Sequence, residues 1–184
     1  MLAGHIGVAA GAKRWAPQVP IWALLIASFL LDILFLVFWA LGIEDMEAIP
    51  GLDGRYGTTQ FQIDWSHSFF GTMLICLIVL ILCTRWWGGK GAFVLSCVVF
   101  SHWFLDVIVH RLDLPIAPGD AGVTPRVGLG MWDFPIFVGI LELLIVLGGA
   151  LIWYTMPDST SATRRAAIIA AVAGVAVLVT DIMI

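Results

Sequence analysis

The sequence predicts an all-α membrane protein, a polytopic bundle of five transmembrane helices with an additional N-terminal half-helix. Of its 184 residues, 61% are apolar and only 12% are charged, about half the charged share of an average soluble domain. The apolar residues gather in long runs, and five of these runs approach or exceed the roughly 20 residues that a helix needs to cross a bilayer. We therefore expect residues 1–184 to form a single integral membrane domain.

The five runs and the loops between them give the order of the elements. The expected spans are 21–43, 65–87, 92–111, 134–156 and 166–184. Two long loops, 44–64 and 112–132, contain several Gly and Pro residues, and loops of this length are often functional. Residues 88–91 predict a tight turn, and either Asp64 or Ser66 is expected to cap the helix that follows the first long loop.

Small residues in the last run predict close helix packing. Ala166, Ala170 and Gly174 recur at intervals of four residues, which places them on one face of a helix. Such a face lets the backbone of a neighbouring transmembrane helix approach closely.

The N-terminal segment is apolar, but it is too short to cross a membrane. Lys13 and Arg14 follow it, an order opposite to that of a signal peptide. We expect residues 2–12 to form a half-helix that packs against the first span and directs His5 at Asp32 and His102. The alternative is an amphipathic helix on the membrane surface, with His5 among the lipid headgroups.

The basic residues predict the orientation. Six lie in the short connections (Lys13, Arg14, Arg85, Lys90, Arg164 and Arg165), and three lie at the other side (Arg55, Arg111 and Arg126). This bias predicts cytoplasmic short turns and external long loops. The basic residues form no stripe of the kind that binds nucleic acid, so membrane lipids are the expected partners, and the oligomeric state is left open.

One polar stretch stands inside the third span, at 101–110 (SHWFLDVIVH). In a helix, His102 and Asp106 lie one turn apart on one face, and His110 follows one turn later. This spacing lets one helix present an imidazole nitrogen and a carboxylate oxygen to one divalent metal ion. A polar seam that hydrogen-bonds to neighbouring helices explains this stretch equally well.

Carboxylates elsewhere in the spans favour the metal. Asp32, Asp106 and Glu142 fall inside apolar runs, where each ionised group costs about 2.5–3.5 kcal/mol. No Lys or Arg lies at mid-membrane, so protonation, histidine partners or a cation must compensate.

The histidines fit a cation at this depth. At about 1.5 Å per residue, His5, Asp32 and His102 lie at similar depth, and His67 enters from the side of the long loops. A divalent ion, zinc or alternatively manganese, is the expected cofactor, in a site that opens outward. The expected ligands are His5, Asp32, His67, His102 and Asp106.

The same residues resemble a family of bacterial inner-membrane proteins, the membrane-bound metal-dependent hydrolases. The shared pattern is Gly4-His5, Asp32, His67-Ser68 and Ser101-His102 with Asp106, and closer relatives share the segments 110–115 and 128–132. The resemblance covers roughly residues 4–142 and implies a hydrolase in the bacterial inner (cytoplasmic) membrane. Some members have Pro-Asp-x-Asp-His in the first span, whereas residues 31–35 here are LDILF, which argues against a second metal.

These observations give one enzymatic hypothesis and two alternatives. A metal-activated water would cleave a phosphoester or other ester of a lipid or lipid-linked substrate. Glu142 would orient a ligand histidine or act as the general base, and Arg111, with Arg55 and Arg126, would pair with the phosphate. The alternatives are a small transporter or proton relay, and a membrane assembly protein without catalytic activity.

Overall fold

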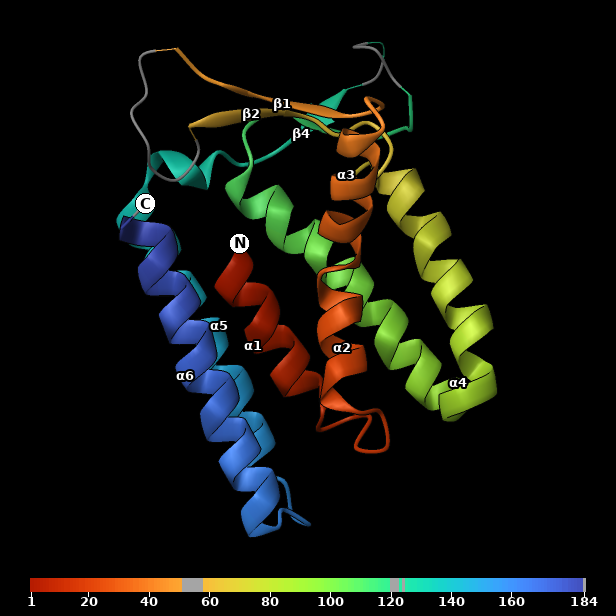
Figure 1. Cartoon of the computed structure of the whole chain (residues 1–184), viewed down its shortest axis with the longest axis vertical. Helices are drawn as coiled ribbons and strands as arrows, with labels where there is room; N and C mark the ends of the chain where they lie inside the picture. Colours follow the sequence, from red (N-terminus) through yellow and green to blue (C-terminus); the bar gives the residue numbers. More distant parts are fainter. Residues whose placement is uncertain (51–57, 120–122, 124, 184) are drawn as a thin grey trace.

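The structure, a computed structural model, describes residues 1–50, 58–119, 123 and 125–183 (Figure 1). Helices make up most of this part of the chain, which confirms the predicted helical class. The helices are α1 (Leu2–Ala12), α2 (Ile21–Ser28), α3 (Leu30–Ala40), α4 (Phe69–Val109), α5 (Pro135–Tyr154) and α6 (Ser161–Met183).

The two long loops contain short antiparallel hairpins that were not predicted. Strand β1 (Asp45–Ala48) pairs with β2 (Thr59–Gln62), with Asp45 opposite Gln62. Strand β3 (Leu114–Pro115) pairs with β4 (Arg126–Val127), and the short 3-10 helix η1 (Met131–Asp133) leads into α5. The strands lie together at one end of the helix bundle, above α3 in Figure 1. We call this the hairpin end.

Three of the described helices, α4, α5 and α6, are long and apolar enough to cross a membrane. A fourth crossing exists if α2 and α3 count as one span, because they are separated only by Phe29 and bent by 54°. The expected first span is therefore a broken helix. The Ser28 hydroxyl donates to the carbonyl of Leu25 at 3.1 Å, a contact of the type that often bends helices.

Helix α4 contains two limbs, 69–87 and 89–109, which meet at Gly88. Gly88 has φ 67° and ψ 171°, a backbone conformation that glycine adopts far more easily than other residues. Figure 1 shows the two limbs diverging from this corner. The turn expected over 88–91 is therefore one non-helical glycine, and the limbs correspond to the second and third expected spans.

The first limb begins later than expected. Its N-cap is Ser68, whose hydroxyl accepts a hydrogen bond from the Gly71 N–H at 3.2 Å. The prediction of Asp64 or Ser66 as the cap was wrong, because both side chains bind partners in the loops instead.

Helix α1 is short, buried and packed most extensively against α5, with further contacts to α2, α4 and α6. The expected packing against the first span is thus only part of its environment. Glycines permit the contact with α5: a Cβ on Gly149 would lie 1.9 Å from the Gly7 carbonyl oxygen. The half-helix is therefore an inner element of the bundle, between α5 and α2 (Figure 1).

The polarity of the structure is that of a membrane protein. Large apolar side chains such as Ile81, Leu144 and Ile169 face outward, whereas His5 and Glu142 are buried. On α6, a Cβ added at Gly174 would lie 2.7 Å from the Val146 side chain of α5. This contact confirms Gly174 as a point of close helix approach.

Candidate metal centre

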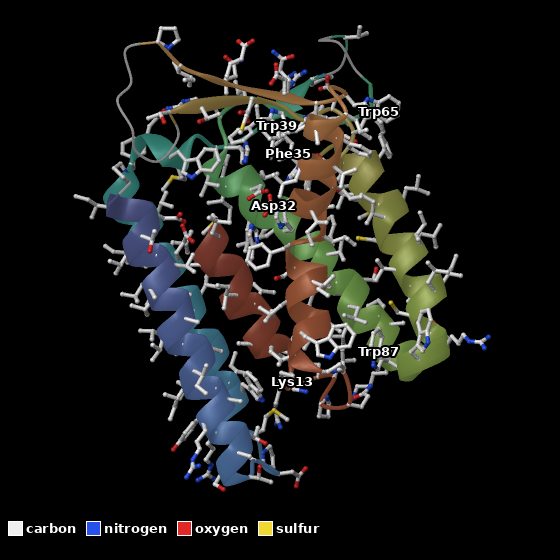
Figure 2. The ribbon with its side chains drawn as sticks, in the orientation of Figure 1. Lys13, Asp32, Phe35, Trp39, Trp65 and Trp87 are labelled. Carbon is white, nitrogen blue, oxygen red and sulfur yellow. The ribbon has the colours of Figure 1, made fainter. Side chains whose placement is uncertain are left out.

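The five expected metal ligands come from four parts of the chain and meet in the middle of the bundle. His5 lies on α1, Asp32 in the first turn of α3, and His67 just before α4, while His102 and Asp106 lie on the second limb of α4. They form two overlapping groups of three residues whose ligand atoms are close enough to hold an ion, and His102 belongs to both groups. Figure 2 shows Asp32 at mid-height in the bundle, near the start of α3.

The first group consists of Asp32, His67 and His102. The two Nε2 atoms of His67 and His102 lie 3.2 Å apart. Oδ1 of Asp32 lies 3.6 Å from the first and 3.5 Å from the second. Two ligands on a tetrahedral zinc with bonds of 2.0–2.1 Å are about 3.3–3.4 Å apart. The triangle therefore has the size that one zinc ion requires.

The second group consists of His5, His102 and Asp106. Oδ2 of Asp106 lies 3.0 Å from Nε2 of His102 and 3.7 Å from Nε2 of His67. Its other oxygen, Oδ1, lies 3.6 Å from Nε2 of His5. The Asp106 carboxylate thus faces the paired imidazoles with one oxygen and His5 with the other.

His5 is placed differently from the other histidines. Its ring stacks on that of His102, with centroids 3.8 Å apart and planes within 6°. An ion in the plane of the His102 ring would lie well outside the plane of the His5 ring, so His5 must rotate to share that ion. Its Nδ1 is buried, and no hydrogen-bond partner for it exists in the described part of the chain.

A backbone carbonyl fixes the tautomer of His102. Nδ1 of His102 lies 2.6 Å from the carbonyl oxygen of Ser28. A carbonyl only accepts, so Nδ1 carries the proton, and in the neutral ring Nε2 has a free lone pair. Carbonyls in the last turn of a helix lack partners within that helix, and Ser28 is the last residue of α2. The break at Phe29 therefore positions the ring of His102.

Two side chains in the loops fix His67 in the same way. Glu44 accepts hydrogen bonds at 2.7 Å from the N–H groups of Trp65 and Ser66 and from the Ser66 hydroxyl. The Ser66 oxygen lies 2.7 Å from Nδ1 of His67. Because the hydroxyl proton goes to Glu44, Ser66 accepts from Nδ1–H, and Nε2 of neutral His67 is free to bind metal.

Glu44 and Ser66 were not recognised as site residues from the sequence. Glu44 lies at the start of the first long loop, yet it is only 3% exposed. Its distance of 22 residues from Ser66 gives no periodic signal. The sequence offered one clue: polar residues stand at both ends of the first long loop, Glu44-Asp45 at its start and Ser66-His67 just after its end.

Glu142 lies next to the site without belonging to either group. It is fully buried, and its Oε2 accepts a hydrogen bond from the backbone N–H of Gly4 at 3.0 Å. This contact holds the first turn of α1 against α5. Because Gly4 precedes His5, Glu142 fixes the end of the helix that presents His5.

His110 and Arg111, which follow Asp106 in the sequence, have defined partners outside the two groups. His110 Nδ1 lies 2.9 Å from Asp113, and its ring lies 4.2 Å from that of Trp132. It belongs to neither metal group. Arg111 pairs with Asp133 at 2.6 Å.

Arg126 joins the two long loops. Its guanidinium lies 2.8 Å from Asp64 and donates to the Asp113 carbonyl at 2.9 Å. The third expected arginine, Arg55, lies outside the described residues.

Comparison with known proteins adds no assignment. No protein-family model matches the chain, and searches of curated proteins and of solved structures found no match. The family resemblance of the motifs therefore stays a prediction, and the geometry of the histidines and carboxylates carries the functional argument.

Proposed function

We propose that this chain is a membrane-embedded hydrolase that uses one divalent metal ion, zinc or manganese, to cleave a phosphoester or other ester of a lipid or lipid-linked substrate. One observation carries the proposal: Nε2 of His67 and Nε2 of His102 face each other at 3.2 Å. In both rings Nδ1–H donates to an oxygen atom. In the neutral rings the lone pairs of the two Nε2 atoms therefore oppose each other. A cation between them removes this conflict, and Asp32 and Asp106 supply compensating negative charge.

The donor set fits zinc or manganese. Imidazole nitrogen suits zinc, and carboxylate oxygen suits both zinc and manganese. His67, His102 and Asp32 would hold the ion, with Asp106 beside them and His5 joining after rotation. A metal with an open coordination position acts as a Lewis acid and lowers the pKa of a bound water.

The exposure of the ligands indicates the direction of substrate access. The side chain of Asp32 is 34% exposed, whereas those of His67, His102 and Asp106 are at most 4% exposed. Neighbouring residues of α3, Ile33 and Leu36, have exposed apolar side chains. The exposure of Asp32 beside these apolar side chains favours a substrate that arrives through the bilayer, which is the argument for a lipid or lipid-linked ester.

The roles of two further residues follow from their contacts. Glu142 is a positioning residue that holds the start of α1 and thereby His5. Arg111, at the hairpin end, is proposed to exchange its contact with Asp133 for a substrate phosphate, because guanidinium groups bind phosphate and carboxylate in similar ways.

We also propose that the protein spans the bacterial inner membrane five times. The two limbs of α4 would cross separately, and the broken α2–α3 pair, α5 and α6 would provide the other crossings. Lys90 lies beside the Gly88 corner, and Lys13 lies in the turn after α1. The basic residues predict that this end is cytoplasmic and that the hairpin end is external.

The proposed activity is tested with the purified protein in vesicles that contain phospholipids or lipid-linked phosphates. Zinc- or manganese-dependent release of the cleaved headgroup is expected, and His102→Ala and Asp32→Asn should abolish it. His110→Ala is the matched control, because it removes a buried histidine that belongs to neither metal group. Absence of metal-dependent cleavage across ester and phosphoester substrates contradicts the proposal.

A proton relay is the second candidate, and a specific observation favours it. Hydrogen-bond contacts connect Glu44 through Ser66 and His67 to His102. A proton shared by the two Nε2 atoms would also relieve the conflict between their lone pairs. The two candidates differ in metal content: a relay needs no bound metal, whereas the hydrolase needs one ion per chain.

A further inference from the structure

A separate apolar groove lies on the side of the bundle below the metal centre. Its volume is about 690 Å³, within the range of pockets that hold small molecules. Helix α1 lines its floor, and α5 and the second limb of α4 form its walls. Four lining residues are glycines. Gly7, Gly11 and Gly149 lie where α1 and α5 meet closely, and Gly148 faces open space.

The groove ends one helical turn below the candidate site. Val98 lines it and His102 lies four residues further along α4, while Ile145 lines it and Glu142 lies three residues earlier on α5. From Val98 the lining continues along α4 to Lys90, about 12 Å at the helical rise. The groove is therefore elongated, with its far end near the Gly88 corner.

The two ends of the groove have different chemistry. Lys90 is the one charged side chain among the lining residues, and Trp15 lies with it. Both are exposed, and no carboxylate pairs with Lys90 within the described ranges. Lys and Trp together are typical of the level of lipid headgroups, whereas the rest of the lining is apolar.

We propose that this groove binds one anionic phospholipid, with the phosphate at Lys90 and one acyl chain along α1 toward Val98 and Ile145. Charge complementarity selects this occupant. Lys13 and Arg14 follow the C-terminal end of α1, and Arg85 lies close to the Gly88 corner, so all three lie at the same end of the bundle as Lys90. Basic side chains near a membrane surface attract anionic lipids. The site does not depend on the proposed hydrolase activity, since it contains none of the metal ligands.

Photo-crosslinking tests both the binding and its direction. The whole chain is placed in vesicles of phosphatidylcholine with a minor fraction of phosphatidylglycerol that carries a diazirine on one acyl chain. A diazirine at the chain end should label peptides near Val98 and Ile145, and one close to the headgroup should label peptides near Lys90. The reverse order would overturn the proposal, because the lipid would then enter from the hairpin end.

Two variants test the groove itself. A Cβ at Gly148 meets nothing within 4 Å, so Gly148→Leu fills the groove without displacing the backbone and should abolish the label. Ala173→Leu places the same side chain on the exposed face of α6 and should leave the label unchanged. Equal labelling of wild type and Gly148→Leu would overturn the proposal.

The charge at the groove end has its own test. Lys90→Gln should reduce the preference for phosphatidylglycerol over a matched phosphatidylcholine probe about fivefold, the effect of one Lys near an anionic surface. Arg85→Gln, which removes an exposed charge at the same end but outside the groove, is the control. An unchanged preference in Lys90→Gln, or an equal loss in both variants, would refute the assignment of the phosphate to Lys90. His102→Ala should leave all labelling intact, which separates this test from that of the metal centre.

Discussion

The hydrogen-bond chain behind His67 gives a quantitative prediction. Ser66→Ala removes the hydroxyl that lies 2.7 Å from both Glu44 Oε2 and His67 Nδ1. The ring of His67 then loses the acceptor that fixes its tautomer and orientation. Loss of such a partner typically lowers metal affinity about 10- to 100-fold, which corresponds to about 1.4–2.7 kcal/mol. We expect zinc affinity to fall within this range, while the helical fold is retained.

The assay is a competition titration of zinc between the detergent-purified protein and a chromophoric chelator. Ser101→Ala is the matched control: its hydroxyl lies next to the ligand His102 in sequence but donates to the Val98 carbonyl within the same helix at 2.7 Å. This control should bind zinc as tightly as the wild type. Unchanged zinc affinity in Ser66→Ala, or an equal loss in both variants, would refute the role assigned to Ser66.

Three further predictions concern packing and topology. Gly149→Ala should lower stability by about 1–3 kcal/mol, because its Cβ would overlap the Gly7 carbonyl of α1; thermal unfolding in detergent measures this, and Gly148→Ala is the neutral control. Gly88→Ala should lower stability by about 1–3 kcal/mol, because φ 67° with ψ 171° is a conformation that is largely restricted to glycine; equal melting temperatures would contradict this. Reporters fused after Asp158 and after the C-terminal residue should read as cytoplasmic and external respectively, and the opposite readings would contradict the proposed topology.

The convergence of the candidate metal ligands was predictable, because polar groups stand out in apolar membrane segments. Asp32 and Asp106 lie in apolar runs where an ionised group needs a partner. His102 and Asp106 follow helical spacing, so their convergence required only that the segment be helical. The structure brings both residues together with His5 and His67.

The contacts that hold these ligands were not predictable in the same way. The break at Phe29 involves neither Pro nor Gly, yet it places the Ser28 carbonyl against His102. Glu44 reaches Ser66 only because the first long loop folds back on itself through a hairpin. Such pairings depend on tertiary packing across more than 20 residues, which local sequence patterns do not encode.

The position of α1 was also predictable only in part. Its short apolar sequence predicted a buried half-helix with an inward His5, and the structure places His5 against His102. Its close packing against α5 depends on contact between Gly7 and Gly149, which lie 142 residues apart in the sequence. Two separate glycines reveal no partnership until the helices are placed together.

X-ray absorption spectroscopy at the zinc edge, on protein purified with stoichiometric zinc, tests the metal centre most directly. We predict one ion per chain with two imidazole nitrogens and carboxylate oxygens at about 2.0–2.2 Å, and loss of this signature in both His67→Ala and His102→Ala. His110→Ala should keep it. A protein that binds no metal, or one whose spectrum is unchanged when His67 and His102 are replaced, would contradict the proposed centre.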